Sequence, residues 1–272
     1  MSGNSRTVIG AGADASWLVM VHGMSQDHRV FSSQVEAFKD RYRILLIDLP
    51  GHGFSTDVPG PFGHIELASH VAGAMEIAGV PGCHYWATHT GTSLGLLLAS
   101  ENPGRFHSMI LEGAVLPGHV MHSVEAALQR ARDVAQAEGV AEARRRWFDE
   151  GPWFDVMRRR PEECRADEHW AIVSEFSGAP WLYDGQAQSV TPIDERLRSI
   201  DVPVLLYNGE RDVQDFVDVA DCLEELLPRV TRATIPDAGG FPAWEFPERV
   251  NRLVADFLSS ASGATIHRAR TA

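Results

Sequence analysis

The residues best placed for chemistry lie in one turn between a buried strand and a helix. Residues 84–103 read HYWATHTGTSLGLLLASENP, which is the layout of a nucleophile elbow: an apolar strand, a sharp turn and a helix. Such a turn is strained, so its flanking positions take small residues, here Ala87 and Gly91. His89 stands at the apex, where Ser, Cys or Asp is usual. An imidazole at this position predicts general-base chemistry or, as the lesser alternative, a histidine nucleophile.

Two hydroxyl residues beside His89 are alternative nucleophiles. Placing Thr90 at the apex would put the β-branched Thr88 and Thr92 at the tight flanks, and Ser93 falls inside the helix. A histidine also tolerates the positive φ of such a turn better than a β-branched residue does. We therefore place His89 at the apex and keep Thr90 as the alternative.

Strands and helices that must hold this turn alternate along the chain. Short apolar runs typical of buried strands occur at 17–21, 44–47, 84–87, 109–111, 204–207 and 233–235. Runs with the i, i+3, i+4 spacing of one-sided helices occur at 30–39, 65–78, 91–101, 216–227 and 247–258. This alternation predicts an α/β fold with a doubly wound, mostly parallel sheet.

Residues 116–200 interrupt the alternation with helical stretches at 123–148 and around 153–160. We predict that they form a helical cap inserted between two core strands. The core is then expected to consist of residues 1–115 and 201–262, with one short strand near Arg6–Ile9 at its start. Residues 263–272 are small and polar, and we expect a frayed tail there.

Composition narrows the classes of partner. The net charge of −13 over 272 residues argues against nucleic acid and against anionic membrane surfaces. No apolar run approaches the roughly 20 residues needed to span a bilayer, and residues 1–15 lack the apolar core of a secretory signal. Cys83, Cys164 and Cys222 are far apart and are expected to be free thiols in a reducing cytoplasm. Without an HxH or HExxH pattern, we expect neither a metal nor a cofactor.

Four motifs in a fixed order resemble the α/β-hydrolase superfamily over nearly the whole chain. They are VHGM at 21–24, DLPGHGFS at 48–55, the elbow at His89 and GERD at 209–212. The chain is similar to compact, lid-bearing members such as small esterases, enol-lactonases and C–C bond hydrolases. The resemblance implies one hydrolase-fold domain whose reactive groups meet at the elbow.

The usual triad is incomplete. In the superfamily Ser attacks, His takes its proton and Asp orients the His. Mapped by motif, this chain has His89, Gly240 and Asp212, because IPDAGGFP at 235–242 carries Gly where the family loop has His. An imidazole reaches about 2–3 Å farther than a serine hydroxyl. We therefore expect His89 to fill the space left at Gly240 and to pair directly with Asp212 as a base dyad.

The resemblance also implies an oxyanion hole and a pocket. The backbone amides of Thr90 and of Gly23 or Met24 would hold the developing negative charge. Other pocket candidates are His28, for which a structural role is favoured, Glu112 as an alternative acid, and Trp153 and Trp181 as an apolar roof.

These residues predict a cofactor-free enzyme that acts on a small, largely apolar carbonyl compound, such as an ester, lactone or β-dicarbonyl. The alternatives are a small-molecule-binding protein without turnover and an esterase that uses Thr90. Hydrolysis and lyase- or isomerase-type proton transfer need overlapping residues, so the sequence does not separate them. The partner is a small molecule, and the sequence leaves a homodimer open.

Overall fold

The computed structural model describes residues 6–269, and only the backbone of 262–269. Seven strands form one sheet in the order β1-β3-β2-β4-β5-β6-β7. Only β1 is antiparallel to its neighbour, and the other pairs are parallel, which confirms the predicted doubly wound sheet. The strands are β1 (Arg6–Gly10), β2 (Trp17–Val21), β3 (Arg43–Ile47), β4 (Cys83–Thr88), β5 (Phe106–Glu112), β6 (Val204–Gly209) and β7 (Val230–Ile235).

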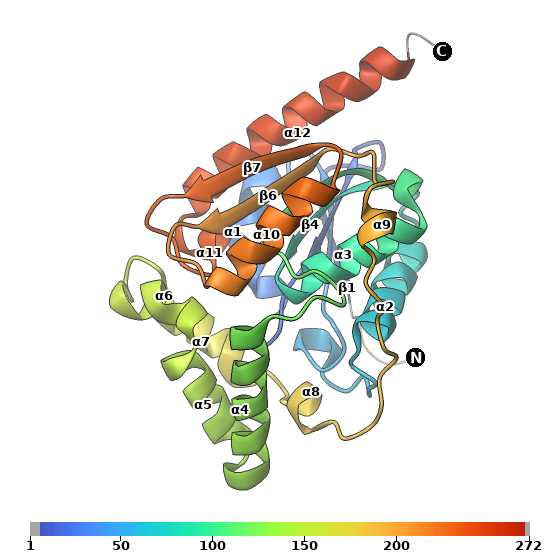
Figure 1. The fold of residues 1–272 in the computed structure, drawn as a ribbon. Helices are drawn as coiled ribbons and strands as arrows, with labels where there is room; N and C mark the ends of the chain where they lie inside the picture. Colours follow the sequence, from blue (N-terminus) through green and yellow to red (C-terminus); the bar gives the residue numbers. More distant parts are fainter. Residues whose placement is uncertain (1–5, 270–272) are drawn as a thin grey trace.

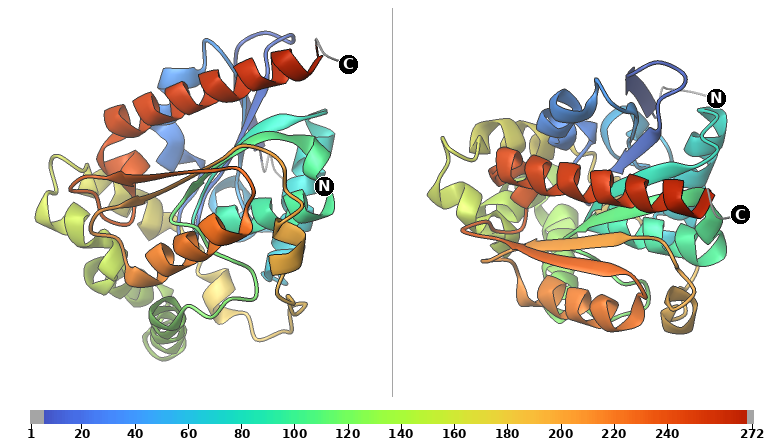
Figure 2. Two further views of the ribbon diagram at one scale, coloured as in Figure 1. Left: turned by 45° about the horizontal axis from the view of Figure 1, so that its top comes forward. Right: turned by 90° about the horizontal axis from the view of Figure 1, so that it is seen from above.

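Helices cover both faces of the sheet, which explains why its central strands are apolar throughout. Every residue of β2 and of β4 is buried. Helices α1 and α12 pack together on one face, and α2 and α3 lie on the other (Figure 2). The core helices are α1 (Ser32–Phe38), α2 (His64–Ile77), α3 (Thr90–Glu101), α10 (Gln214–Leu226), α11 (Pro242–Glu245) and α12 (Pro247–Ala269).

The cap is helical and lies between β5 and β6 in the chain, grouped at one end of the sheet (Figure 1). Gly139, with φ of 92°, divides the predicted 123–148 stretch into two helices that pack on each other. The cap helices are α4 (His122–Glu138), α5 (Val140–Glu150), α6 (Asp155–Arg159), α7 (Ala166–Glu175) and α8 (Ala179–Leu182). Helix α9 (Asp194–Leu197), in the same inserted segment, packs instead on the core helices α3 and α10.

The expected frayed tail at 263–272 lies partly outside the described residues. The backbone of residues 263–269 continues helix α12, and residues 270–272 lie outside the described part of the chain. Within the described residues, no helix combines the length and apolarity that a bilayer crossing requires.

Candidate active site

The turn after β4 has the conformation of an elbow, with His89 at its apex. His89 has φ of 44° and ψ of −117°, and α3 begins at the next residue, Thr90. The His89 amide donates to the carbonyl of Glu112 at 2.9 Å, which ties the turn to the end of β5. At the flank, a Cβ on Gly91 would lie 2.4 Å from the carbonyl oxygen of Val21, so only glycine fits there.

The His89 ring is buried among aromatic side chains. It makes edge-to-face contacts with Phe216 and Phe241, at centroid distances of 4.8 and 4.9 Å. Its Nε2 is buried and has no hydrogen-bond partner among the described residues, and it faces Gly113, where a Cβ would lie 2.8 Å away. Burial lowers the pKa of His89 to about 4, although a hydrogen bond to the Gly240 backbone acts to raise it. The ring is therefore neutral at pH 7.

Asp212 does not pair with His89, so the direct dyad expected from the sequence does not form in this structure. The Asp212 carboxylate accepts from the side-chain amide of Asn208 and from the backbone amide of Val213, both at 2.8 Å. Among the described residues, no hydrogen bond joins it to His89. Burial raises the pKa of Asp212 to about 7, although these two hydrogen bonds and Arg232 oppose the rise.

The expectation of empty space at Gly240 is also wrong. A Cβ on Gly240 would lie 2.5 Å from the Cβ of Trp153, so the cap residue already fills the place of a larger side chain. The Gly240 amide also donates to the carbonyl of Trp153 at 3.3 Å. Trp153 packs against this loop, the His89 ring hydrogen-bonds to the Gly240 backbone and lies beside Phe241, and Asp212 keeps its own partners.

Of the amides expected to form the oxyanion hole, that of Gly23 already donates a hydrogen bond within the protein. Its N–H donates to the side-chain oxygen of Gln26 at 3.1 Å. The Met24 amide takes part in no hydrogen bond among the described residues, and Thr90 opens α3, where first-turn amides lack an intrahelical acceptor. Met24 and Thr90 both line the cavity described below. These two amides are thus the ones available to a carbonyl oxygen.

Two further candidates lie away from the cavity lining. Glu112 is buried, accepts from the Ala243 amide at 2.7 Å and is hydrogen-bonded to Tyr207. Burial raises its pKa to about 8, against those two hydrogen bonds. His28 hydrogen-bonds to the Asp48 carboxylate and stacks on Phe54, so its role is structural.

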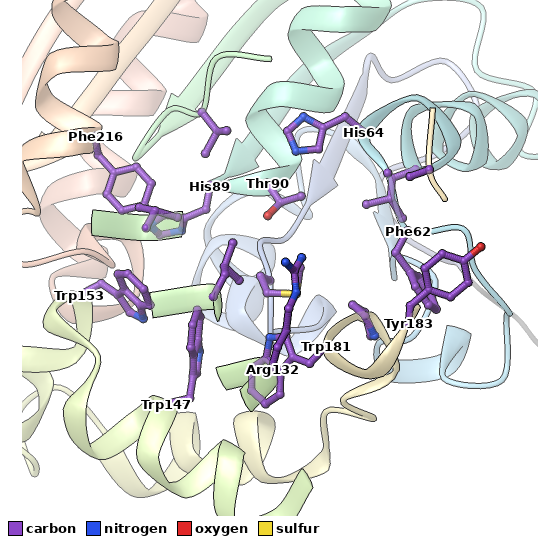
Figure 3. Close-up of a pocket in the computed structure, with 18 of the residues that line it drawn as sticks. Phe62, His64, His89, Thr90, Arg132, Trp147, Trp153, Trp181, Tyr183 and Phe216 are labelled. Carbon is purple, nitrogen blue, oxygen red and sulfur yellow. The ribbon is translucent and has the colours of Figure 1, made fainter. Parts of the chain in front are cut away.

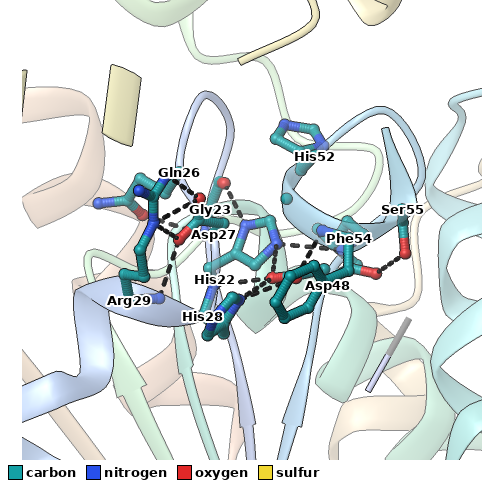
Figure 4. Close-up of polar contacts among 12 residues, drawn as sticks. His22, Gly23, Gln26, Asp27, His28, Arg29, Asp48, His52, Phe54 and Ser55 are labelled. Atoms are coloured by element: carbon teal, nitrogen blue, oxygen red, sulfur yellow. Dashed lines mark hydrogen bonds and ion pairs between the residues drawn. The ribbon is translucent and has the colours of Figure 1, made fainter. Parts of the chain in front are cut away.

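Asp48 and the loop that follows β2, which contains the VHGM motif, form one polar cluster, which we call the motif-turn cluster (Figure 4). Its members are His22, Gln26, Asp27, His28, Arg29 and Asp48. Asp48 accepts from the backbone amides of His28 and Phe54 at 2.7 and 2.9 Å. Burial acts to raise the pKa of Asp48, but His28 and the other donors hold it below its usual value. Asp48 therefore stays ionised and fixes the loop that carries Met24.

A cavity of about 500 Å³ lies between the elbow and the cap. Figure 3 shows the ring of His89 beside Phe216, with Trp147 and Trp153 across from it. Trp153 and Trp181 both line the cavity, as does Trp147, whose indole N–H donates to the Ser25 hydroxyl at 2.8 Å. The cavity has the size and the largely apolar, aromatic lining typical of small-molecule sites.

Comparison with known proteins accounts for this arrangement. The family model of the alpha/beta hydrolase fold matches residues 16–247. The chain belongs to the alpha/beta hydrolase fold family. It is 22% identical over 200 residues to 3-oxoadipate enol-lactonase 2 of Acinetobacter baylyi, covering 74% of this chain and 73% of the relative. It is 26% identical over 260 residues to the pimeloyl-[acyl-carrier protein] methyl ester esterase of Nitrosospira multiformis, covering 89% and 92%.

Solved structures show the same fold. MenH from S. aureus superposes with a TM-score of 0.81 at 21% identity, covering 95% of this chain and 99% of that one. The enol-lactonase from Burkholderia xenovorans LB400 gives a TM-score of 0.79 at 20% identity, covering 93% and 95%. The family model and the curated relatives support an enzyme with hydrolase-like activity.

This alpha/beta hydrolase family member also places at the site a residue that sequence reasoning missed. His169, on cap helix α7, is fully buried, and its ring packs 4.9 Å from Phe241. Its Nε2 lies 3.5 Å from the side-chain nitrogen of Gln26, and burial lowers its pKa to about 3. A single histidine in a cap helix gives no sequence signal. Among the described residues, no three His, Cys, Asp or Glu side chains are grouped to hold a metal ion.

Proposed function

We propose that this hydrolase-family protein acts without a cofactor on a small, largely apolar carbonyl compound, such as an ester, lactone or β-dicarbonyl, in a reducing cytoplasm. The observation that carries the proposal is a neutral, buried His89 at the elbow apex, lining an aromatic cavity beside two available amides. The names of the relatives, an enol-lactonase and a methyl ester esterase, agree with a carbonyl substrate.

The mechanism follows from the described groups. The carbonyl oxygen accepts hydrogen bonds from the Met24 and Thr90 amides, and the N-terminal end of α3 stabilises its developing negative charge. His89, moving from its present position beside Gly113, takes a proton from water or from the carbon next to the carbonyl. Because the ring stays neutral down to about pH 4, the base remains in its active form through the physiological range. Asp212 takes no direct part.

Comparing His89→Ala with Asp212→Asn tests this proposal. Turnover of a panel of nitrophenyl esters and aryl lactones should fall at least about 100-fold in His89→Ala, because a general base typically contributes a rate factor of about that size. Asp212→Asn should stay within a few-fold of the parent, because its partners are Asn208 and Val213. The acid limb of the kcat/KM profile should lie near pH 4 rather than 6.5. A His89→Ala protein that turns over at the parent rate would sink the proposal.

Ligand binding without turnover is the second candidate function. It is favoured by the packing of His89 between Phe216 and Phe241, with Nε2 directed at Gly113. It predicts saturable quenching of tryptophan fluorescence with no product, and a change of affinity alone in His89→Ala. An esterase that uses Thr90 has less support, since no hydrogen bond of the described residues joins its hydroxyl to a base. Fluorophosphonate labelling abolished by Thr90→Val would establish that third reading.

A further inference from the structure

The cavity lining holds one permanently charged side chain among the described residues. That side chain is Arg132 of α4, and no Asp or Glu lines the cavity. The two histidines of the lining, His64 and His89, both have pKa values lowered by burial and are neutral at pH 7. Arg132 and its lining neighbour Gln136 are exposed side chains, so this single cation lies at the open edge of an otherwise apolar, aromatic cavity.

Several other cap arginines have partners within the cap, although Arg130 has none in the described part of the chain. Arg145 and Arg146 pair with carboxylates on their own or the preceding helix, and Arg158 donates to two backbone carbonyls. Arg132 has neither an ion pair nor a hydrogen bond among the described residues. Figure 3 shows its side chain extending from α4 with the guanidinium in the cavity. Its donors therefore remain free for a bound molecule.

Helix α4 lines the cavity with a row of side chains that changes from apolar to polar along the helix. Val124, Leu128, Arg132 and Gln136 follow one another at intervals of four residues, so they share a face. The apolar end of this row is fixed near His89, because the amides of Ser123 and Val124 donate to Asp215, one residue before Phe216. Arg132 lies two turns farther along, about 12 Å of helix rise from Val124. The backbone positions of the apolar and polar ends are thus well separated along the helix axis.

We infer that Arg132, with Gln136 beside it, binds a carboxylate at the end of the substrate remote from the reacting carbonyl. The planar guanidinium matches a carboxylate with two parallel hydrogen bonds, and the apolar part of the row between the two ends fits a short carbon chain. The inference rests on the proposed function for the position of the carbonyl end. It narrows the substrate class to monoanionic carbonyl compounds with a carboxylate several carbons from the reactive group.

A matched pair of unreactive ketones tests the inference by binding alone. γ-Benzoylbutyrate and its carboxamide, γ-benzoylbutyramide, differ only in charge at one end, and neither can be hydrolysed at its ketone. Their dissociation constants are measured by tryptophan fluorescence for the parent, Arg132→Gln and Arg130→Gln. Arg130 is a matched control, because it lies on the same helix, outside the cavity lining, and is also unpaired among the described residues.

The parent should bind the acid at least about 10-fold more tightly than the amide, and Arg132→Gln should remove that preference while changing amide binding less than about 2-fold. Arg130→Gln should keep the preference. Equal binding of acid and amide by the parent, equal losses in both variants, or no binding of either ketone would overturn the inference. Acid preference lost in Arg132→Gln with no turnover of any ester would leave the inference standing and contradict the proposed function.

Discussion

Two polar regions at the same end of the sheet contrast sharply. In the motif-turn cluster the carboxylate of Asp48 accepts from several donors, and its pKa is held below the usual value. In the elbow region, Glu112 and Asp212 have pKa values raised to about 8 and 7 by burial. The Nε2 of His89 has no hydrogen-bond partner among the described residues. In the first region the buried carboxylate has hydrogen-bond partners that keep it ionised. In the second region a buried ring nitrogen has no partner, and two buried carboxyl groups have raised pKa values.

This difference separates scaffold from site. Buried polar groups that satisfy one another fix a loop, and the motif-turn cluster fixes the loop that carries Met24. Buried polar groups left without partners cost stability, and they are retained where a ligand or a reaction uses them. The motifs around His22 and Asp48 thus belong to the scaffold, while the unpartnered Nε2 of His89 lies at the elbow.

The largest effect is expected from Asp48→Asn. An amide cannot accept all the hydrogen bonds that Asp48 receives from His28 and Phe54, so buried donors lose their partner. We expect a loss of about 2–4 kcal/mol in the free energy of unfolding, measured by urea denaturation at pH 7. Asp57→Asn is the matched control, since Asp57 is exposed, and it should change stability by less than about 0.5 kcal/mol. Similar losses in both variants would contradict the contrast.

A smaller loss is expected from Gly240→Ala. The added methyl would lie 2.5 Å from the Cβ of Trp153 and 3.0 Å from its backbone, which cannot move without shifting the cap. We expect a destabilisation of about 1–3 kcal/mol. Gly73→Ala is the control, because Gly73 lies within α2 with open space around it, and it should stabilise the protein by about 0.5–1 kcal/mol. A neutral Gly240→Ala would show that Trp153 does not fill this place.

Glu112→Gln should have the smallest effect, on the pH dependence of stability. The folded pKa of about 8 lies above the ordinary 4.5, so the stability that protonated Glu112 contributes is complete below pH 4.5 and is lost as the pH rises through 8. Glutamine does not titrate. The decline in unfolding free energy between pH 6.5 and 8.5 should therefore be shallower in the variant, by on the order of 1 kcal/mol. An unchanged slope would mean that Glu112 is ionised throughout.

Local signals in the sequence predicted the fold and the apex of the elbow. The strand at Trp17–Val21 has the predicted bounds, and the small flanks Ala87 and Gly91 correctly located the turn at His89. What could not be predicted was which side chains contact one another, whether they are distant or near in the sequence. Nothing near residue 240 indicates that Trp153 fills its space, and the partner of Asp212 is Asn208, four residues earlier, rather than the elbow.

Gly113 makes the packing around the elbow specific for a histidine at position 89. Its φ of 53° and missing side chain make the seat for the His89 ring, since a Cβ there would meet Nε2 at 2.8 Å. A serine at 89 would leave that seat empty between Phe216 and Phe241, and Trp153 would still exclude a histidine at 240. Each single step toward the ordinary triad thus yields a less well packed protein without a complete triad. Placing a serine at 89 together with a histidine at 240 would therefore require simultaneous changes in both the core and the cap.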